Sequence, residues 1–313
     1  MKEIGGYIEL DTYTLPMRHE DALALNCGRN ALAYLIEARN IKKICLPYFL
    51  CDSVKNVCKK YHVDIRYYHI KENFEPEDVR LSEDEWFYVV NYYGQVEYET
   101  LEKIKQKYRR VIVDNAQAYF MDALPDTDTI YTCRKYFGVS DGAFLYTDAI
   151  LNHELSRDVS FERIRYILGR YEKSGAEFYR ESVENNHSFN EEPIKLMSKL
   201  TRNLLQAIDY ERVKNIRTQN FCVLEETLKE VNQLSLRRGE GAFMYPLFMD
   251  NADEIRKKCL ENKIYIPTLW PNVLEEVPKE WIEWTYAKNI LPIPCDQRYN
   301  LEDMHFIIKC IKE

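Results

Sequence analysis

The sequence of 313 residues lacks the segments that mark membrane and secreted proteins. No apolar run in it approaches the roughly 20 residues that a membrane-spanning helix needs. The first residues, Met1 to Tyr7, also lack the apolar stretch of a signal peptide. These absences predict a cytoplasmic protein that does not associate with membranes.

Patterns that would indicate a metal site or a disulfide framework are also missing. The nine cysteines are scattered singly without a Cys-x-x-Cys pair, and the six histidines form no His-Glu-x-x-His motif. Cysteines that are dispersed in this way, and odd in number, usually serve as small buried apolar residues. We therefore expect neither a structural metal nor disulfide bonds.

The charge balance and the missing glycine motifs exclude two further classes. The 43 basic and 51 acidic residues give a net charge of −8, and no block of Lys and Arg offsets it, so we expect no nucleic-acid partner. The chain has neither a G-x-G-x-x-G motif nor a P-loop, which disfavours a nucleotide-binding α/β protein of those kinds.

Strand and helix patterns alternate through the first half of the chain. The hydrophobic content of 46% suits a large core and two domains. The patterns predict strands at 43–47, 64–68, 86–90, 111–114, 129–132 and 143–147, and helices at 31–38, 52–61 and 98–109, with Asp52-Ser53 available as a cap. This alternation predicts a parallel α/β sheet that binds ligands at the carboxyl ends of its strands.

The second half is first helical and then mixed. Residues 156–229 are charged and predict long helices, and 209–229 has apolar residues at helical spacing. Beyond it we expect a strand at 241–247, a helix at 253–262, a strand at 264–267 and a closing helix from Leu301. We therefore expect a large domain at 1–230, ending in the helical segment, and a small α/β domain at 231–313.

Two stretches indicate a chemistry. The apolar run Val111-Ile112-Val113 ends in the carboxylate of Asp114, and about twenty residues later Lys135 precedes a turn that contains Gly142. A carboxylate can keep a pyridine nitrogen protonated, and a lysine amine can join an aldehyde covalently. Together they predict a site for pyridoxal phosphate (PLP).

Each of these residues also has an ordinary interpretation. Asp114 could cap a helix or lie in a surface turn, and Arg134-Lys135 could be an exposed basic pair. If strands flank the pair, one member must point inward, and we expect it to be Lys135. Burial and nearby positive charge would then supply its free amine.

A phosphate cradle is the interpretation that we favour for Gly28-Arg29-Asn30. The tripeptide lies where a helix begins, and the free N–H groups and positive dipole end of a helix attract anions. An ordinary loop-to-helix junction is the alternative.

Five stretches, in this order, carry a resemblance to a known family: 27–32, 46–51, 91–95, 114–118 and 134–142. With them the chain resembles a divergent, short member of the DegT/DnrJ/StrS family of PLP-dependent aminotransferases. The resemblance implies the α/β fold of fold-type-I PLP-dependent transferases, with a large, mostly parallel-sheet domain and a smaller C-terminal α/β domain.

The resemblance also implies roles for individual residues. Lys135 is the expected catalytic residue and carries the cofactor, Asp114 contacts the pyridine nitrogen, and Gln117 contacts the phenolic oxygen of the ring. The other residues expected at the cofactor are Gly28, Arg29, Asn30 and Thr132 around the phosphate, with Arg134 as a further candidate, and Cys51 at the position over the ring.

The activity implied is transfer of an amino group from an amino acid, with glutamate as the expected donor, to a keto-sugar linked to a nucleotide. The enzyme would be a homodimer. A dehydratase would require histidine in place of Lys135, which counts against that reaction.

A catalytically silent scaffold or binding protein is the main alternative. The family usually has a flat residue over the ring where this chain has Cys51, so Tyr48 or Phe49 would have to stack instead. Ala143 stands where the family usually has a second glycine, and the segment 156–189 is shorter than in the family. In the C-terminal part, Trp270-Pro271 and 296–299 are candidate substrate contacts or simply packed loops.

Overall fold

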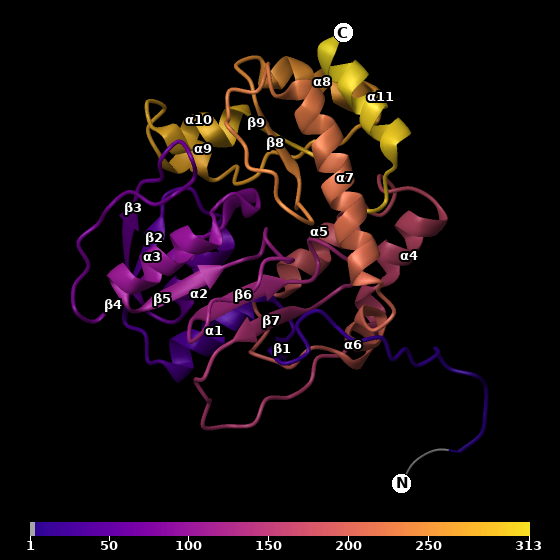
Figure 1. The fold of residues 1–313 in the computed structure, drawn as a ribbon. Coiled ribbons are helices and arrows are strands. Elements are labelled where there is room, and N and C mark those ends of the chain that lie inside the picture. Colours follow the sequence, from indigo (N-terminus) through magenta and orange to yellow (C-terminus); the bar gives the residue numbers. More distant parts are fainter. Residues whose placement is uncertain (1–3) are drawn as a thin grey trace.

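Short apolar strands form a seven-stranded central sheet in the computed structural model, which describes residues 4–313 (Figure 1). The strand order is β1-β7-β6-β5-β4-β2-β3. The strands are β1 (Leu23–Leu25), β2 (Lys43–Pro47), β3 (Asp64–Tyr68), β4 (Glu85–Val90), β5 (Val111–Asp114), β6 (Asp128–Thr132) and β7 (Ala143–Tyr146).

The sheet is parallel apart from β7. β2 pairs in parallel with β3 and β4, β4 with β5, and β5 with β6, whereas β7 runs antiparallel to both β6 and β1. β1 therefore points the same way as β6. The predicted strands and the mostly parallel sheet are confirmed, while β1 was not predicted because three residues are too short for a clear pattern.

Helices of the expected length connect the parallel strands. They are α1 (Gly28–Ala38), α2 (Asp52–Lys60) and α3 (Tyr98–Tyr108). The expected cap of the second helix was wrong: α2 starts at Asp52, and its N-cap is Cys51, whose side chain makes no capping hydrogen bond. The backbone at Cys51 is extended, so the helix begins one residue too early for Asp52 or Ser53 to act as its N-cap.

The segment 156–229 is helical, as expected, but it is broken into pieces. These are η2 (Phe161–Arg163), α4 (Arg165–Glu172), α5 (Tyr179–Ser188), α6 (Lys199–Leu205) and α7 (Tyr210–Leu228). Between α5 and α6 the chain lies beside β1, where Met197 N–H donates to the carbonyl of Ala24 at 3.0 Å.

The C-terminal part forms a second, two-stranded antiparallel sheet of β8 (Tyr245–Phe248) and β9 (Ile290–Ile293). Its helices are α8 (Ala252–Glu261), α9 (Val273–Glu276), α10 (Ile282–Asn289) and α11 (Leu301–Lys312). The strand expected at 264–267 was wrong. Ile264 and Ile266 are buried in the core there without a hydrogen-bonded neighbour strand among residues 4–313, and Pro267 has no N–H to offer one.

α7 takes part in two hydrophobic cores, one at each half of the helix. The N-terminal half of α7 contributes Tyr210 and Val213 to the core around the central sheet. Its C-terminal half contributes Phe221, Leu224 and Leu228 to the core under β8 and β9. Figure 1 shows α7 running from the level of the central sheet to the C-terminal elements. The domain boundary near residue 230 stays a prediction.

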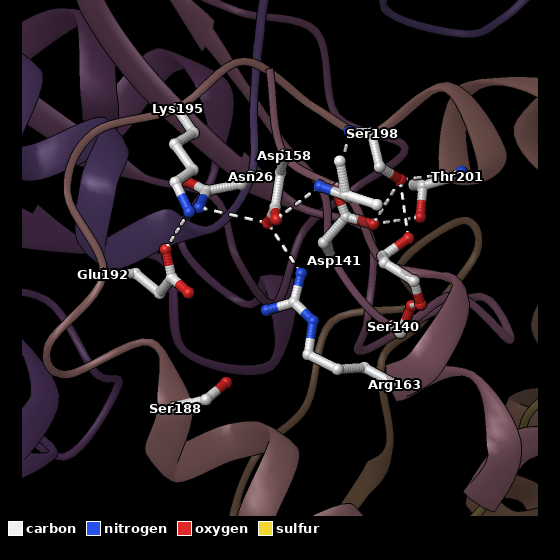
Figure 2. Close-up of polar contacts among 12 residues, drawn as sticks. Asn26, Ser140, Asp141, Asp158, Arg163, Ser188, Glu192, Lys195, Ser198 and Thr201 are labelled. Atoms are coloured by element: carbon white, nitrogen blue, oxygen red, sulfur yellow. Dashed lines mark hydrogen bonds and ion pairs between the residues drawn. The ribbon is translucent and has the colours of Figure 1, made fainter. Parts of the chain in front are cut away.

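A buried carboxylate holds the turn between β6 and β7. Asp141 is fully buried and accepts hydrogen bonds from Ser198 N at 2.8 Å, from Ser198 Oγ at 2.7 Å and from Thr201 Oγ1. Beside it, Asp158 accepts from Arg163 Nη2 at 2.7 Å and from Asn26 Nδ2 at 3.3 Å (Figure 2). The turn that carries Lys135 is thereby tied to the start of α6.

No helix within residues 4–313 has the combination of length and apolar composition that crossing a bilayer requires.

Candidate functional site

The residues expected at the site follow different strands, but the sheet brings them to one edge. β5 ends at Asp114 and β6 at Thr132, and α1 begins at Gly28, three residues after the end of β1. These strands run in the same direction, so their carboxyl ends lie at the same edge. The edge is therefore the place where a ligand of a parallel α/β sheet is expected.

Asp114 is held at this edge by two donors. Tyr88 Oη donates to Oδ2 of Asp114 at 2.8 Å, and the N–H of Ala116 donates to Oδ1 at 2.8 Å. Burial, the Asp114 carboxylate and the Cys51 thiol all raise the pKa of Tyr88, to well above its usual value. Tyr88 therefore stays protonated as a donor, and the plane of the carboxylate is fixed.

Gly28 and Thr132 touch across the gap between α1 and β6. A Cβ at Gly28 would lie 2.8 Å from Thr132 Cγ2, which is too close for a real contact. The hydroxyl of Thr132 donates to the carbonyl of Ala116 at 3.4 Å. Since the N–H of Ala116 also donates to Asp114, three successive contacts link the start of α1 to the Asp114 carboxylate.

Gln117 is buried, and its side chain supports a neighbouring turn. Its Oε1 accepts a hydrogen bond at 2.7 Å from the N–H of Tyr93, whose backbone is left-handed with φ of 54°. The amide oxygen of Gln117 is thus used within the fold, which leaves the two N–H groups of the amide as its donors toward a ligand.

The side chain of Asn30 is used in packing. Its Nδ2 donates to Asn26 Oδ1 at 2.9 Å and to the carbonyl of Pro193 at 2.7 Å. What Asn30 offers to a ligand is therefore the backbone N–H at the third position of α1. The N-cap residue, Cys27, makes no regular side-chain capping hydrogen bond, although its thiol faces the N–H groups of Asn30 and Arg29; burial raises the pKa of this thiol, and these N–H groups oppose the rise.

Two arginines converge on one neutral residue. Arg29 donates to the backbone carbonyl of Asn186 at 2.8 Å, and Arg29 and Arg134 donate to Oδ1 of Asn186 at 3.2 and 3.3 Å. The Nε atoms of both arginines are buried and have no hydrogen-bond partner among residues 4–313. Burial lowers the pKa of Arg29, and the neighbouring charge of Arg134 lowers it further. This arrangement concentrates positive charge and leaves the two buried Nε–H donors unpaired.

Arg134, and not Lys135, is the more buried member of the basic pair. Arg134 is half-buried, with its guanidinium 4.9 Å from the ring centre of Phe189, whereas Lys135 is exposed in the single chain. Lys135 Nζ lies 5.6 Å from the ring centre of Phe243 and has no ion-pair partner within residues 4–313. The expectation that Lys135 points inward was therefore wrong for the isolated chain, because the turn directs the longer guanidinium toward α5.

Neither candidate for stacking over a cofactor ring is available. Phe49 is fully buried in the core, 4.3 Å from the ring of Trp270, and Tyr48 stacks on Tyr67 at 5.0 Å. Cys51, at the start of α2, is half-buried, and its Sγ lies 2.9 Å from Ser53 Oγ. Trp270 is accordingly a packed loop residue rather than a substrate contact.

The other C-terminal candidates also make structural contacts. Asp296 forms an ion pair with Arg298, with an Oδ1 to Nε distance of 2.6 Å. Gln297 Nε2 donates to the carbonyl of Tyr136 at 2.7 Å, and its Oε1 accepts from Arg217 Nε at 2.7 Å. These bonds join the C-terminal part to the turn that carries Lys135.

The sequence did not reveal several residues of this edge. Tyr88, which holds Asp114, lies in the middle of an apolar strand without a motif. Asn186 and Phe243 are far from Arg134 and Lys135 in the chain, so only the fold pairs them. Within residues 4–313 no group of three or more His, Cys, Asp or Glu side chains is placed to hold a metal ion.

Comparison with known proteins gives similarity in structure but not in sequence. No family model and no curated protein matches the sequence. Among solved structures, a DegT DnrJ EryC1 StrS aminotransferase from Brucella abortus has a TM-score of 0.64 at 15% identity, covering 93% of this chain and 85% of that one.

Two further structures are similar to the same degree. DesV of S. venezuelae, in complex with a ketimine intermediate, has a TM-score of 0.67 at 14% identity and covers 93% of this chain and 84% of its own. The E. coli GDP-4-keto-6-deoxy-D-mannose-3-dehydratase with bound hydrated PLP has a TM-score of 0.63 at 12% identity, with coverages of 93% and 87%. These likenesses confirm the expected fold, because the chain shares the mostly parallel α/β architecture of these three proteins.

The contact between Gly28 and Thr132 can be tested with a double-mutant cycle. We expect Gly28→Ala to destabilise the protein, because the new methyl group meets Thr132 Cγ2. In a Thr132→Ser background, which removes that methyl group, the same change should be tolerated. Urea unfolding of the four proteins should give a coupling energy of about 1–2 kcal/mol. Additive effects of the two changes would contradict the contact.

Proposed function

We propose that this chain is a divergent member of the DegT/DnrJ/StrS family and a PLP-dependent aminotransferase. It would transfer an amino group from an amino acid, glutamate in the first instance, to a keto-sugar linked to a nucleotide. The observation that carries the proposal is the placement of Asp114, the Gly28–Arg29 cradle and the Lys135 turn at one edge of this fold. The fold alone would not decide the reaction.

The residues of the edge fit the cofactor. A phosphate monoester needs donors and positive charge, and Arg29 and Arg134 supply two buried Nε–H groups without partners among residues 4–313. Gly28, which has no side chain, lets the start of α1 lie close to Thr132, and the first N–H groups of that helix have no carbonyl partner within it. Thr132, at the end of β6, adds a hydroxyl. When bound, PLP supplies an electron sink for the chemistry at the amino carbon.

Each remaining residue then has a defined task. Asp114, fixed by Tyr88, is placed to keep a pyridine nitrogen protonated, and Gln117 can donate an N–H to a ring oxygen. Lys135 would hold the cofactor covalently. Once the amino acid has displaced it, its Nζ would carry a proton between the substrate carbon and the cofactor carbon. Cys51 lies where the family has a flat residue, so the ring would be covered less firmly on that side.

We further propose that the protein is a homodimer, and exposed apolar side chains support this. Tyr7 is 96% exposed in the segment before β1, and Ile150 and Tyr171 are 81% and 88% exposed in the segment between β7 and α5. Large apolar side chains that are exposed in the single chain would be covered from water at a subunit interface. A partner subunit there would also cover the side of the molecule from which α5 reaches the site.

The cofactor link is tested first by the visible spectrum of the protein with added PLP. We expect a yellow absorption band that borohydride fixes onto Lys135, as shown by peptide mass mapping, and that L-glutamate bleaches. Lys135→Ala should lose the band completely, while Lys199→Ala, an exposed lysine on α6, should keep it. No band in the wild-type protein would favour a catalytically silent scaffold.

The role of the arginine pair is tested by comparing PLP with pyridoxal, which lacks the phosphate. Arg29→Gln and Arg134→Gln should each weaken PLP binding about tenfold or more, because each removes a charge-assisted hydrogen bond to the phosphate. Binding of pyridoxal should change little. Arg180→Gln, at a side chain that is 91% exposed, is the matched control. Equal weakening for both compounds, measured by absorbance titration, would contradict phosphate binding by this pair.

The homodimer is tested by sedimentation velocity at several protein concentrations. We expect a dimer for the wild type and a shift toward monomer for Tyr171→Glu, because a buried carboxylate without a partner opposes association. Tyr265→Glu, at an exposed tyrosine of the C-terminal part, should remain dimeric. A monomeric wild type would overturn this proposal.

A further inference from the structure

A loop of the C-terminal part, residues 237–243, runs along the candidate site. At its first residue, the backbone N–H of Arg237 donates to Gln95 Oε1 at 2.7 Å, and Gln95 Nε2 donates back to the carbonyl of Arg237 at 3.1 Å. One glutamine side chain thus binds both backbone groups of Arg237. This pairing fixes the start of the loop to the turn after β4.

The other end of the loop is fixed as well. Gly241 has φ of +62°, and a Cβ there would lie 2.2 Å from the ring of Phe120, so the backbone packs directly on that ring. Its N–H donates to Thr218 Oγ1 at 2.9 Å. Two residues later, Phe243 meets Lys135 Nζ at 5.6 Å from the ring centre. The loop therefore has a defined path that ends at the expected catalytic lysine.

The beginning of the loop lies beside another expected cofactor residue. Arg237 Nη2 donates to the carbonyl of Gly94. A Cβ at Gly94 would be 3.5 Å from the carbonyl oxygen of Gln117, so these two backbones are in contact. Arg237 and Gln117 thus both contact Gly94, on the same edge of the sheet as Asp114.

Arg237 carries a charge that is not neutralised within the described chain. It is half-buried, its Nε is buried without a hydrogen-bond partner, and no carboxylate of residues 4–313 lies within ion-pair distance of it. The adjacent Arg238 is different, because it is 63% exposed and pairs with Glu226 at 3.3 Å. A rigidly held guanidinium with a free donor and a neutral partner is suited to an incoming carboxylate.

We propose that Arg237 binds the carboxylate of the amino-acid donor. This rests on the proposed function, in which Arg29 and Arg134 take the phosphate and Lys135 takes the cofactor aldehyde. An amino acid brings a carboxylate next to the reacting amine, and that anion needs a cation at the same edge. Arg237 supplies it from the loop that also contacts Lys135, and the clamp by Gln95 keeps the guanidinium in place.

The test uses glutarate, a dicarboxylate that has no amine and so reports binding without reaction. Calorimetric titration of the PLP-loaded protein should show at least about tenfold weaker glutarate binding for Arg237→Gln than for the wild type. Arg237→Lys should recover part of the loss, since it keeps the charge but not the paired donors. Arg238→Gln should bind glutarate as the wild type does. In parallel, the L-glutamate concentration that half-saturates bleaching of the visible band should rise by a similar factor.

The outcomes separate this inference from the proposed function. Unchanged glutarate binding in Arg237→Gln, with the visible band intact, would overturn the assignment of Arg237 alone. Loss of the band in both Arg237→Gln and Arg237→Lys would also overturn it, because Arg237 would then support the cofactor. A wild-type protein that forms no band would overturn the proposed function, and this inference with it.

Discussion

Parallel hydrogen bonding between β5 and β6 is the constraint on which the site depends. Asp114 pairs with Ile130 in this ladder, so the strand that ends in the carboxylate lies beside the strand that leads to Thr132 and Lys135. A slip of one residue would turn the side chain of Asp114 to the other face of the sheet. Ile112 and Val113 point to opposite faces of the sheet and are both buried, so this strand is apolar on both sides, as central parallel strands are.

Charge is distributed unevenly around this edge. Arg29 and Arg134 lie close together, face a neutral amide and retain buried donors, and Arg237 repeats this situation on the C-terminal side. Like charges in partial burial destabilise a folded protein unless an anion compensates them. This is consistent with the two proposed binding sites, one for a phosphate at Arg29 and Arg134 and one for a carboxylate at Arg237.

The C-terminal part contributes to the edge through its loop and not through its sheet. Gln297 and Arg217 bind the turn that carries Lys135, and Gln95 clamps Arg237. The two cores thus share a border at which polar groups from both sides meet. A site built at such a border can change its shape when the two parts move, and the proposed aminotransferase would need this to admit its two substrates in turn.

Local sequence patterns predicted those features that depend on short-range periodicity. The strands around 111–114 and 129–132, the helix at 209–229 and the position of Asp114 at a strand end all follow from apolar spacing and helix caps. The strand expected at 264–267 was wrong because its apolar residues pack into the core under β8 and β9 without pairing with either strand, and periodicity does not show whether a neighbouring strand exists.

By itself the sequence determined most of the strands and helices up to β7 and the residues proposed to bind the cofactor, since these depend on residue type and local spacing. Only the tertiary structure decided which side chains meet: Tyr88 with Asp114, Asn186 with the arginine pair, Phe243 with Lys135 and Gln95 with Arg237. It also decided that Tyr48 and Phe49 belong to packed aromatic clusters. The physical reason is that contacts between distant segments follow from how strands pair and how cores pack, and neither is encoded in the spacing of a single segment.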